Sequence, residues 1–417
     1  MSKYLFLFFL SCCFIPAAVS AQEADRCGTQ HIHGLQLQQN PGFMIRRLQQ
    51  EQFTQDFAAR QKSMRTMSVI TIPVVFHVVF ENAAENIPDF RLDSQLVALN
   101  RDYRKLNSDV SNVPSVWQSL ASDCEIQFCR AGTDPNGNAT SGITRTGTTV
   151  TAFPVDNSVM FAASGGHDIW DRDKYLNIWI CDLVSGTLGY AAFPGGSPST
   201  DGVVLDYSYT GTTGATAPYN KGRSGTHEVG HWLNLEHIWG NDGGSCSGTD
   251  YCTDTPNQGN WNFTCHSPNT VITDNCSPNA PGIMWMNYMD YTDDACMYMF
   301  TYEQKVRMQA TLNGIRSGIL TSNGCVVSVA EQEAGQTLRI FPSPSSGLFT
   351  LHTGSIPAQE LDIHVYTMPG QQVYHRRLEA LHEKEFTLDL TELASGMYFV
   401  QVNTGAEKVT RKVIIRR

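Results

Sequence analysis

Two histidines flank a glutamate at a spacing that strongly constrains the fold. His227 and His231 lie four residues apart, and Glu228 directly follows the first of them. Residues four apart share one face of a helix, so both imidazoles can reach one ion if residues 223–235 are helical. His237 follows after six more residues, too far round a continuing helix to join them. The chain must turn sharply first, and Asn234 is the residue best suited to the left-handed conformation that such a turn needs.

These residue types predict a zinc site with hydrolytic chemistry. Three imidazoles from His227, His231 and His237 can hold Zn²⁺ and leave one position open for water. The ion lowers the pKa of that water and polarises a peptide carbonyl. Glu228 lies beside the ligands and can take a proton from the water. The alternative is a set of helix-surface residues with no metal, which does not account for the third histidine.

The motif resembles that of the metzincin metallopeptidases, H-E-x-x-H-x-x-G-x-x-H. The sequence here reads H-E-V-G-H-W-L-N-L-E-H, and it departs from the pattern by placing Asn234 at the glycine position. The resemblance implies a Met-turn at residues 287–291, with Met289 as an apolar floor below the zinc. Ordinary core packing is the alternative for this methionine. The resemblance also implies that Tyr291 stabilises the tetrahedral intermediate.

Residues 70–325 are more closely similar to the pappalysin family, particularly its compact bacterial members. The similarity rests on the zinc motif, on residues 175–180 and 254–256, and on the acidic pair after the Met-turn. It implies that Asp294 lies in the S1′ pocket and favours Arg or Lys after the scissile bond, because a buried carboxylate pairs directionally with a guanidinium. A solvated loop acid is the alternative. It also implies structural calcium on Asp250, Asp254 and Thr255, which would otherwise be turn residues.

Cysteines suggest both latency and disulfides. Cys27 lies in an Arg-Cys-Gly sequence that resembles a cysteine switch, in which a thiolate occupies the fourth zinc position of the latent form. A disulfide to Cys27 is the alternative. The family resemblance further implies two disulfides, Cys246–Cys276 and Cys265–Cys296. If Cys27 is a zinc ligand, an odd number of cysteines remains in the exported chain, so at least one other is unpaired.

The first residues predict export. An apolar run ends in Val19-Ser20-Ala21, which is typical of a signal peptidase site, and it is too short for a permanent membrane anchor. A lipoprotein signal ending at Cys12 or Cys13 is the alternative. The polar segment that follows is typical of a pro-segment. The predicted organisation is a signal peptide (1–21), a pro-segment (22–65), a metzincin-like metallopeptidase domain (66–325), a linker (326–337) and a β-sandwich (338–417).

The last eighty residues or so resemble the sorting domain of the type IX secretion system of Bacteroidetes. The resemblance is carried by residues 340–344, 368–371 and 393–398 and by a basic end at 412–417, although Ser343 stands where the family usually has Asn. It implies export through the periplasm of a Gram-negative bacterium, a partner in the secretion machinery, and a final location outside the cell or on its surface. A carbohydrate- or surface-binding sandwich is the alternative.

Patterning predicts an α+β sheet layer followed by a small all-β sandwich, and the family resemblance implies a metzincin-like arrangement of twisted sheet, active-site helix, Met-turn and C-terminal helix. Strands are expected at 69–80, 125–130, 175–181 and 202–207, and helices at 90–106, 223–235 and 302–320. The formal net charge of −11 argues against nucleic acid as a partner. The predicted function is a secreted, latent zinc endopeptidase acting on peptides or proteins. A catalytically silent zinc-containing adhesin and a hydrolase of non-peptide substrates are the alternatives.

Overall fold

A computed structural model describes most of the chain as two folded units, and both belong to the predicted α+β and all-β classes. The described residues are 26–61, 68–240, 242, 245–325, 339–352, 360–367, 371–379, 385–403 and 408–417. The predicted signal peptide and linker lie outside them, as do residues 368–370 of one sorting-domain motif. Among the helices that are described, none combines the length and apolar character needed to cross a bilayer.

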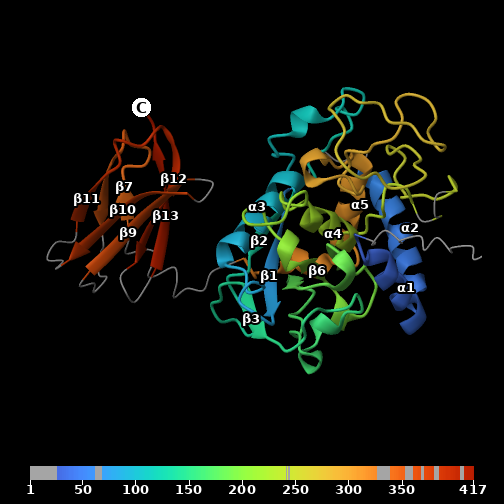
Figure 1. Cartoon of the computed structure of the whole chain (residues 1–417), viewed down its shortest axis with the longest axis horizontal. Helices are drawn as coiled ribbons and strands as arrows, with labels where there is room; N and C mark the ends of the chain where they lie inside the picture. Colours follow the sequence, from blue (N-terminus) through green and yellow to red (C-terminus); the bar gives the residue numbers. More distant parts are fainter. Residues whose placement is uncertain are drawn as a thin grey trace, which may run out of the picture.

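The larger unit is built on a six-stranded mixed sheet (Figure 1). The strand order is β2-β1-β4-β6-β5, and β3 pairs with the second half of β1 beyond the end of β2. All these pairings are parallel except that of β5, which runs antiparallel to β6 at the edge of the sheet. The strands are β1 (Ile70–Phe80), β2 (Ile126–Arg130), β3 (Ile143–Gly147), β4 (Leu176–Cys181), β5 (Gly189–Ala191) and β6 (Val203–Asp206).

Helices α3 (Asp89–Tyr103), α4 (Arg223–Trp232) and α5 (Tyr302–Asn313) each contribute buried apolar residues to one core with the sheet. Every residue of α4 is buried, so this helix runs through the interior. A capping box between Thr301 and Gln304 starts α5. The predicted helix at 302–320 is too long, because α5 ends at Asn313 with Gly314 as its C-cap, and only a short 3-10 helix follows.

Short 3-10 helices occupy parts of the connecting segments. They are η1 (Val110–Asn112), η2 (Ser158–Met160), η3 (Ala162–Ser164), η4 (Val184–Gly186), η5 (Pro198–Thr200), η6 (Tyr207–Tyr209), η7 (Asp294–Cys296) and η8 (Ser317–Thr321). The long segment between α4 and α5 otherwise consists of turns and loops in its described residues. Its shape therefore depends on side-chain hydrogen bonds and disulfides rather than on backbone ladders.

The predicted pro-segment folds into two helices, α1 (Thr29–Gln39) and α2 (Phe43–Gln61). The α1 helix packs on β5, and α2 packs on α5. Ile32 and Phe43 are fully buried. The segment is therefore an integral layer of the larger unit (Figure 1).

The C-terminal unit is a sandwich of two antiparallel sheets, with strand orders β10-β9-β12-β13 and β11-β8-β7 (Figure 1). Alternating residues such as Leu361, Ile363 and Val365 form its core. The strands agree closely with those that the alternating sequence pattern predicts, at 338–341, 348–353, 361–366, 372–377, 385–390, 397–402 and 408–415. They are β7 (Arg339–Phe341), β8 (Leu348–His352), β9 (Glu360–Thr367), β10 (Gln372–Glu379), β11 (Glu385–Asp389), β12 (Gly396–Asn403) and β13 (Lys408–Ile415).

A buried carboxylate ties the C-terminal end of α4 to the segment after α5. Asp201 accepts hydrogen bonds from Trp232 Nε1 at 2.7 Å and from Arg316 Nη1 at 2.6 and 2.7 Å. Arg316 also donates to the Trp232 carbonyl at 3.0 Å. Arg172 reaches the same carboxylate at 3.2 Å from a partly exposed position. Asp201 and Arg316 are both buried, so neither charge has water as a substitute partner.

We predict that Asp201→Ala lowers the free energy of unfolding by about 3–5 kcal/mol, because it leaves the Arg316 guanidinium buried without its partner. Arg172→Ala is the matched control and should cost about 1 kcal/mol or less. All seven tryptophans lie between residues 117 and 285, so tryptophan fluorescence during urea unfolding reports on this unit. Both variants would also carry Glu228→Ala, which removes the predicted general base, so that peptidase activity does not digest the sample during unfolding. Equal unfolding free energies for the two variants would contradict this account.

Candidate metal centre and substrate cleft

Three buried imidazoles converge at one point in the larger unit. The Nε2 atom of His231 lies 3.1 Å from Nε2 of His227 and 3.1 Å from Nε2 of His237. The Nδ1 atom of His227 donates to the Tyr288 carbonyl at 2.7 Å, and Nδ1 of His231 donates to the Leu235 carbonyl at 2.7 Å. Both rings are thereby held in the tautomer that turns the Nε2 lone pair toward the centre.

The electrostatics of the three rings fit a cation. Burial lowers the pKa of His227 to about 4 and holds the pKa values of His231 and His237 well below the ordinary value. The imidazoles are therefore neutral near pH 7. Lone pairs that face one another at such short separations repel, and a shared divalent ion relieves this repulsion.

The turn after α4 has the predicted form. Asn234 adopts a φ of +77°, in the left-handed region, which brings His237 back toward the two helical histidines. Met289 packs against the inner face of α4. A Cβ on Gly230 would lie 2.5 Å from the Met289 sulfur, so a larger residue there would require the Met289 side chain to move. The backbone turn is further held by Asn287, whose Oδ1 accepts from Met289 N at 2.9 Å.

Residues of the pro-segment occupy the centre. The Cys27 sulfur and one nitrogen of each histidine all lie within 4.8 Å of one another. Glu228 Oε2 accepts from Thr29 Oγ1 at 2.9 Å and from Cys27 Sγ at 3.4 Å. Cys27 forms a parallel β-bridge with Gly189 of the edge strand β5, and Gly28 N donates to Gly189 O at 2.9 Å. The pro-segment thus extends the sheet at the place where the glutamate and the histidines meet.

A second pro-segment contact, on the turn after α4, was not predicted. Arg47 donates to Glu236 Oε1 at 2.6 Å and also to the side-chain oxygen of Asn234. Its guanidinium lies 4.3 Å from the ring centre of Phe193. No local sequence pattern indicates this pairing, because Arg47 is one of several basic residues in a polar segment and Glu236 lies between His231 and His237.

A cleft beside the metal centre contains two of the predicted site residues, Tyr291 and Asp294. The Tyr291 ring lies 5.7 Å from that of His227 and 5.1 Å from that of His237, between ring centres. Arg26 of the pro-segment also lies in the cleft, with its guanidinium 4.0 Å from the Phe263 ring centre. The cleft is lined by Arg26, Cys27, Leu188, Tyr219, Arg223, Ser224, His227, Glu228, Asp290, Tyr291, Thr292, Asp294 and Met297.

Asp294 is buried and not a solvated loop acid. Its Oδ2 atom accepts from the backbone N–H groups of Lys221 at 2.7 Å and Arg223 at 3.1 Å, at the start of α4. Burial raises its pKa to about 6, against the opposing effect of these hydrogen bonds and of the Arg223 charge. Arg223 itself is paired with Asp109 at 2.7 Å. The carboxylate therefore titrates close to neutrality within the cleft.

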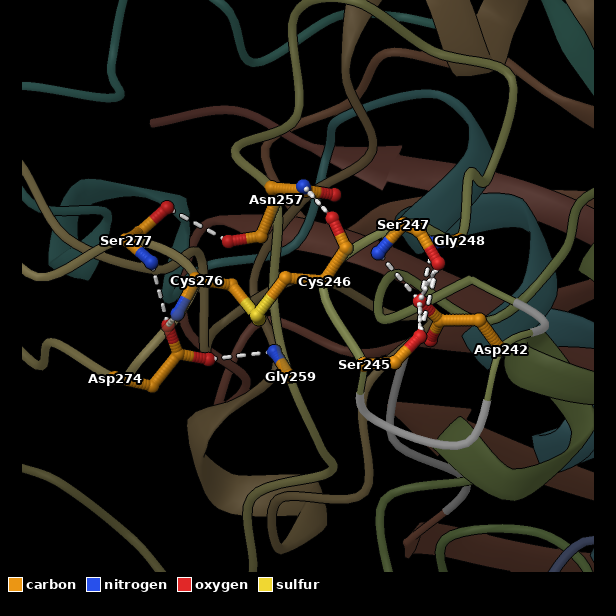
Figure 2. Close-up of a disulfide and its surroundings, with 10 residues drawn as sticks. All are labelled: Asp242, Ser245, Cys246, Ser247, Gly248, Asn257, Gly259, Asp274, Cys276 and Ser277. Atoms are coloured by element: carbon orange, nitrogen blue, oxygen red, sulfur yellow. Dashed lines mark hydrogen bonds between the residues drawn. A yellow bond between two sulfur atoms is a disulfide. The ribbon is translucent and has the colours of Figure 1, made fainter.

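The two disulfides implied by the family resemblance, Cys246–Cys276 and Cys265–Cys296, are present in the structure. They connect parts of the long segment between α4 and α5. Figure 2 shows the first bond. On one side of it, Asp242 accepts hydrogen bonds from the hydroxyl groups of Ser245 and Ser247 and from the backbone N–H groups of Ser247 and Gly248. On the other side Asp274 accepts from the backbone N–H of Gly259 at 2.6 Å (Figure 2).

A third disulfide, Cys129–Cys325, joins β2 to the end of the larger unit and was not predicted. Buried thiols are found at Cys124, Cys181 and Cys252. They agree with the expectation that an odd number of cysteines remains beside Cys27. Parity was the one sequence signal available, and it does not say which residues pair.

The three predicted calcium ligands make protein contacts in the structure. Asp250 accepts from Thr255 Oγ1 at 2.7 Å, and burial raises its pKa to about 7. Asp254 points elsewhere and accepts from Thr301 Oγ1 at 2.8 Å and from Glu303 N at 2.9 Å, which supports the start of α5. Calcium binding by these residues remains a prediction.

Comparison with known families matches both units. Residues 163–313 match the model described as pregnancy-associated plasma protein-A, a peptidase family, and residues 339–416 match that of the secretion system C-terminal sorting domain. The predicted type IX export in Bacteroidetes is thereby confirmed.

Similar proteins are metalloproteases. An extracellular metalloprotease of Arthroderma otae is 31% identical over 276 residues, which cover 64% of this chain and 88% of that protein. Mature mirolysin of Tannerella forsythia, in complex with a cleaved peptide, is 50% identical with a TM-score of 0.60, over 61% of this chain and 97% of that one. A mutant of Tannerella forsythia promirolysin is 48% identical with a TM-score of 0.60, over 64% of this chain and 91% of that one. The chain therefore belongs to the pregnancy-associated plasma protein-A family of peptidases and is a metallo-endopeptidase with a C-terminal sorting domain.

Proposed function

We propose that the chain is a zinc endopeptidase made as a latent zymogen, which hydrolyses peptide bonds with Glu228 as general base and prefers Arg or Lys at P1′. The observation that carries the proposal is the convergence of three neutral imidazoles beside Glu228, with a pro-segment thiol at the same point. Three nitrogen donors and one sulfur donor are a ligand set that suits zinc. When bound, the ion supplies a Lewis acid and lowers the pKa of water in the site.

Glu228 is positioned for proton transfer. Its carboxylate projects from α4 beside the ligand nitrogens, and Oε2 is held by Thr29 and Cys27 in the latent form. Departure of the pro-segment releases this oxygen. Glu228 then takes a proton from the attacking water and returns it to the leaving amine, as general-base hydrolysis requires.

Tyr291 and Asp294 act on the substrate. The Tyr291 ring lies next to the rings of His227 and His237 and also stacks with Phe263. From this position its hydroxyl would donate to the developing oxyanion. Asp294 places a buried negative charge in the same cleft, which favours a guanidinium or ammonium group of the substrate. Activity on peptides agrees with the metalloproteases to which this chain is similar, and it disfavours the silent adhesin.

We predict cleavage of a mixed peptide library by the purified protein after removal of its pro-segment, with cuts before Arg or Lys. Glu228→Ala should lower kcat/KM by at least about 10³-fold, because proton transfer and water positioning are lost together. A chelated wild-type sample should also be inactive and should recover on zinc addition. Mass spectrometry of the products reads out both rate and position. The proposal is wrong if folded, zinc-loaded protein leaves every peptide intact.

The pKa of Asp294 gives a pH test of specificity. The carboxylate is charged above about pH 6 and neutral below it. The ratio of kcat/KM for P1′ Arg over P1′ Leu should therefore fall about tenfold between pH 7.5 and pH 5, because about one tenth of Asp294 stays ionised one unit below its pKa. Using a ratio on one enzyme cancels pH effects on the metal centre.

Asp294→Asn should show a low ratio at both pH values. Asp293→Asn is the matched control, since it changes the neighbouring, half-buried acid, and it should keep the wild-type pH dependence. A pH-independent ratio in the wild type, or equal behaviour of the two variants, would remove Asp294 from the specificity role.

Latency should depend on Cys27 and on the Arg47 contact. We predict that Cys27→Ala raises the activity of the intact zymogen at least about tenfold, because water can then enter the fourth position. Arg47→Ala should accelerate loss of the pro-segment, since it breaks a buried ion pair with Glu236. Gln38→Ala, on the exposed part of α1, is the control. Activity is measured as the initial rate on a fluorogenic peptide, and gels show whether the pro-segment is still intact. If the intact Cys27→Ala zymogen is as inactive as the wild type, the cysteine switch is excluded.

A further inference from the structure

We propose that the C-terminal sandwich carries a zinc site of its own, formed by Asp362, His364 and His375. The potential ligand atoms of these three residues lie within 4.8 Å of one another. They come from the neighbouring strands β9 and β10 of the four-stranded sheet. This site is independent of the metal centre in the larger unit and of the peptidase function proposed for it.

The strand register gathers the three side chains on the outer face of the sheet. His364 and His375 are directly paired across β9 and β10, and Asp362 lies two residues before His364 on the same face. The intervening Ile363 points into the sandwich core and is buried. In the observed register, the burial of Ile363 and its core neighbours leaves these three groups together on the opposite face of the sheet.

The contacts within the cluster position its ligand atoms. Asp362 uses one oxygen for His375 Nε2 at 2.6 Å and the other for His364 Nε2 at 3.1 Å. The two rings stack with their centres 4.5 Å apart and 20° between their planes. Gln372 Oε1 lies 3.0 Å from Nδ1 of His364. When this oxygen accepts the Nδ1 proton, Nε2 turns its lone pair toward the carboxylate, which is the arrangement that a bound cation requires.

The donor set selects the ion. Two imidazole nitrogens and one carboxylate oxygen suit Zn²⁺, whereas Ca²⁺ and Mg²⁺ prefer oxygen ligands throughout. The side chains of His375 and Asp362 are 49% and 33% exposed, so the ion enters directly from solvent. Three protein ligands leave a fourth position for water.

A bound ion would stabilise the pairing of the edge strand β10 with β9. β10 is the outermost strand of its sheet, and the site would join it to β9 through side chains as well as through the backbone ladder. Arg377 is paired with Asp362 in the register and brings a positive charge to the same face, which opposes a cation. Neutralising Arg377 should therefore strengthen zinc binding.

The test uses the full-length chain carrying Glu228→Ala, equilibrated at a fixed free zinc concentration and analysed for bound zinc by mass spectrometry. We expect His375→Ala to hold one equivalent less than its parent, and His352→Gln, which changes a histidine in the other sheet, to hold the same amount as the parent. Arg377→Gln should lower the zinc concentration needed for half-filling. Equal zinc content in the parent and in His375→Ala across the titration would overturn the proposal.

Hydrogen exchange locates the ion and tests folding in the same samples. At a free zinc concentration ten times the dissociation constant, exchange of the β10 amides should slow about tenfold in the parent chain. The same amides in His375→Ala should not respond to zinc while the remaining strands keep their protection. If zinc slows exchange in β10 equally in both chains, the ion is held elsewhere and the assignment is wrong.

Discussion

The hydrogen bonds from two ligand histidines to backbone carbonyls hold the metal centre together. Tyr288 O and Leu235 O each accept an Nδ1 proton, so the chain itself decides which nitrogen of His227 and His231 faces the point where the three imidazoles converge. Those carbonyls belong to the Met-turn and to the turn after α4. The sheet, the buried helix and the long disulfide-linked segment between α4 and α5 all serve to bring these two turns within reach of one helix face.

Latency uses the same parts. The pro-segment reaches Glu228 through Thr29 and Cys27, and it reaches the turn after α4 through Arg47. The second contact is made to residues between the ligands and not to the ligands themselves. The segment proposed to inhibit the enzyme thus contacts both the side chains of the proposed metal centre and the turn that brings His237 to that centre. Since both helices of the segment bury apolar side chains, its departure exposes new surface on β5 and α5.

The sequence predicted strands well where apolar residues alternate or run together, as in β1 and throughout the sandwich, because burial of one face leaves little freedom of register. The convergence of the three histidines beside Glu228 and the left-handed turn at Asn234 were also predicted correctly, since their spacing is tied to a helix and one turn. It failed where tertiary contacts decide. The helices of the predicted pro-segment have little apolar periodicity, and α5 stops at Asn313 although the pattern continues. The Arg47–Glu236 pair and the Cys129–Cys325 disulfide join residues far apart in the chain, and no local pattern reports such distances.

The Cys129–Cys325 disulfide has a consequence for how the two units can be separated. It closes a loop of 196 residues. In the loop-entropy model this raises the free energy of the unfolded state by about 5 kcal/mol. Its second cysteine directly precedes the segment that leads to the sorting domain. Any proteolytic cut after residue 325 leaves the bond and its loop complete. The peptidase unit therefore ends at a covalent cross-link. Removal of the sorting domain during export would leave a new C-terminus that is still tied to β2 by this disulfide and so cannot unravel from it.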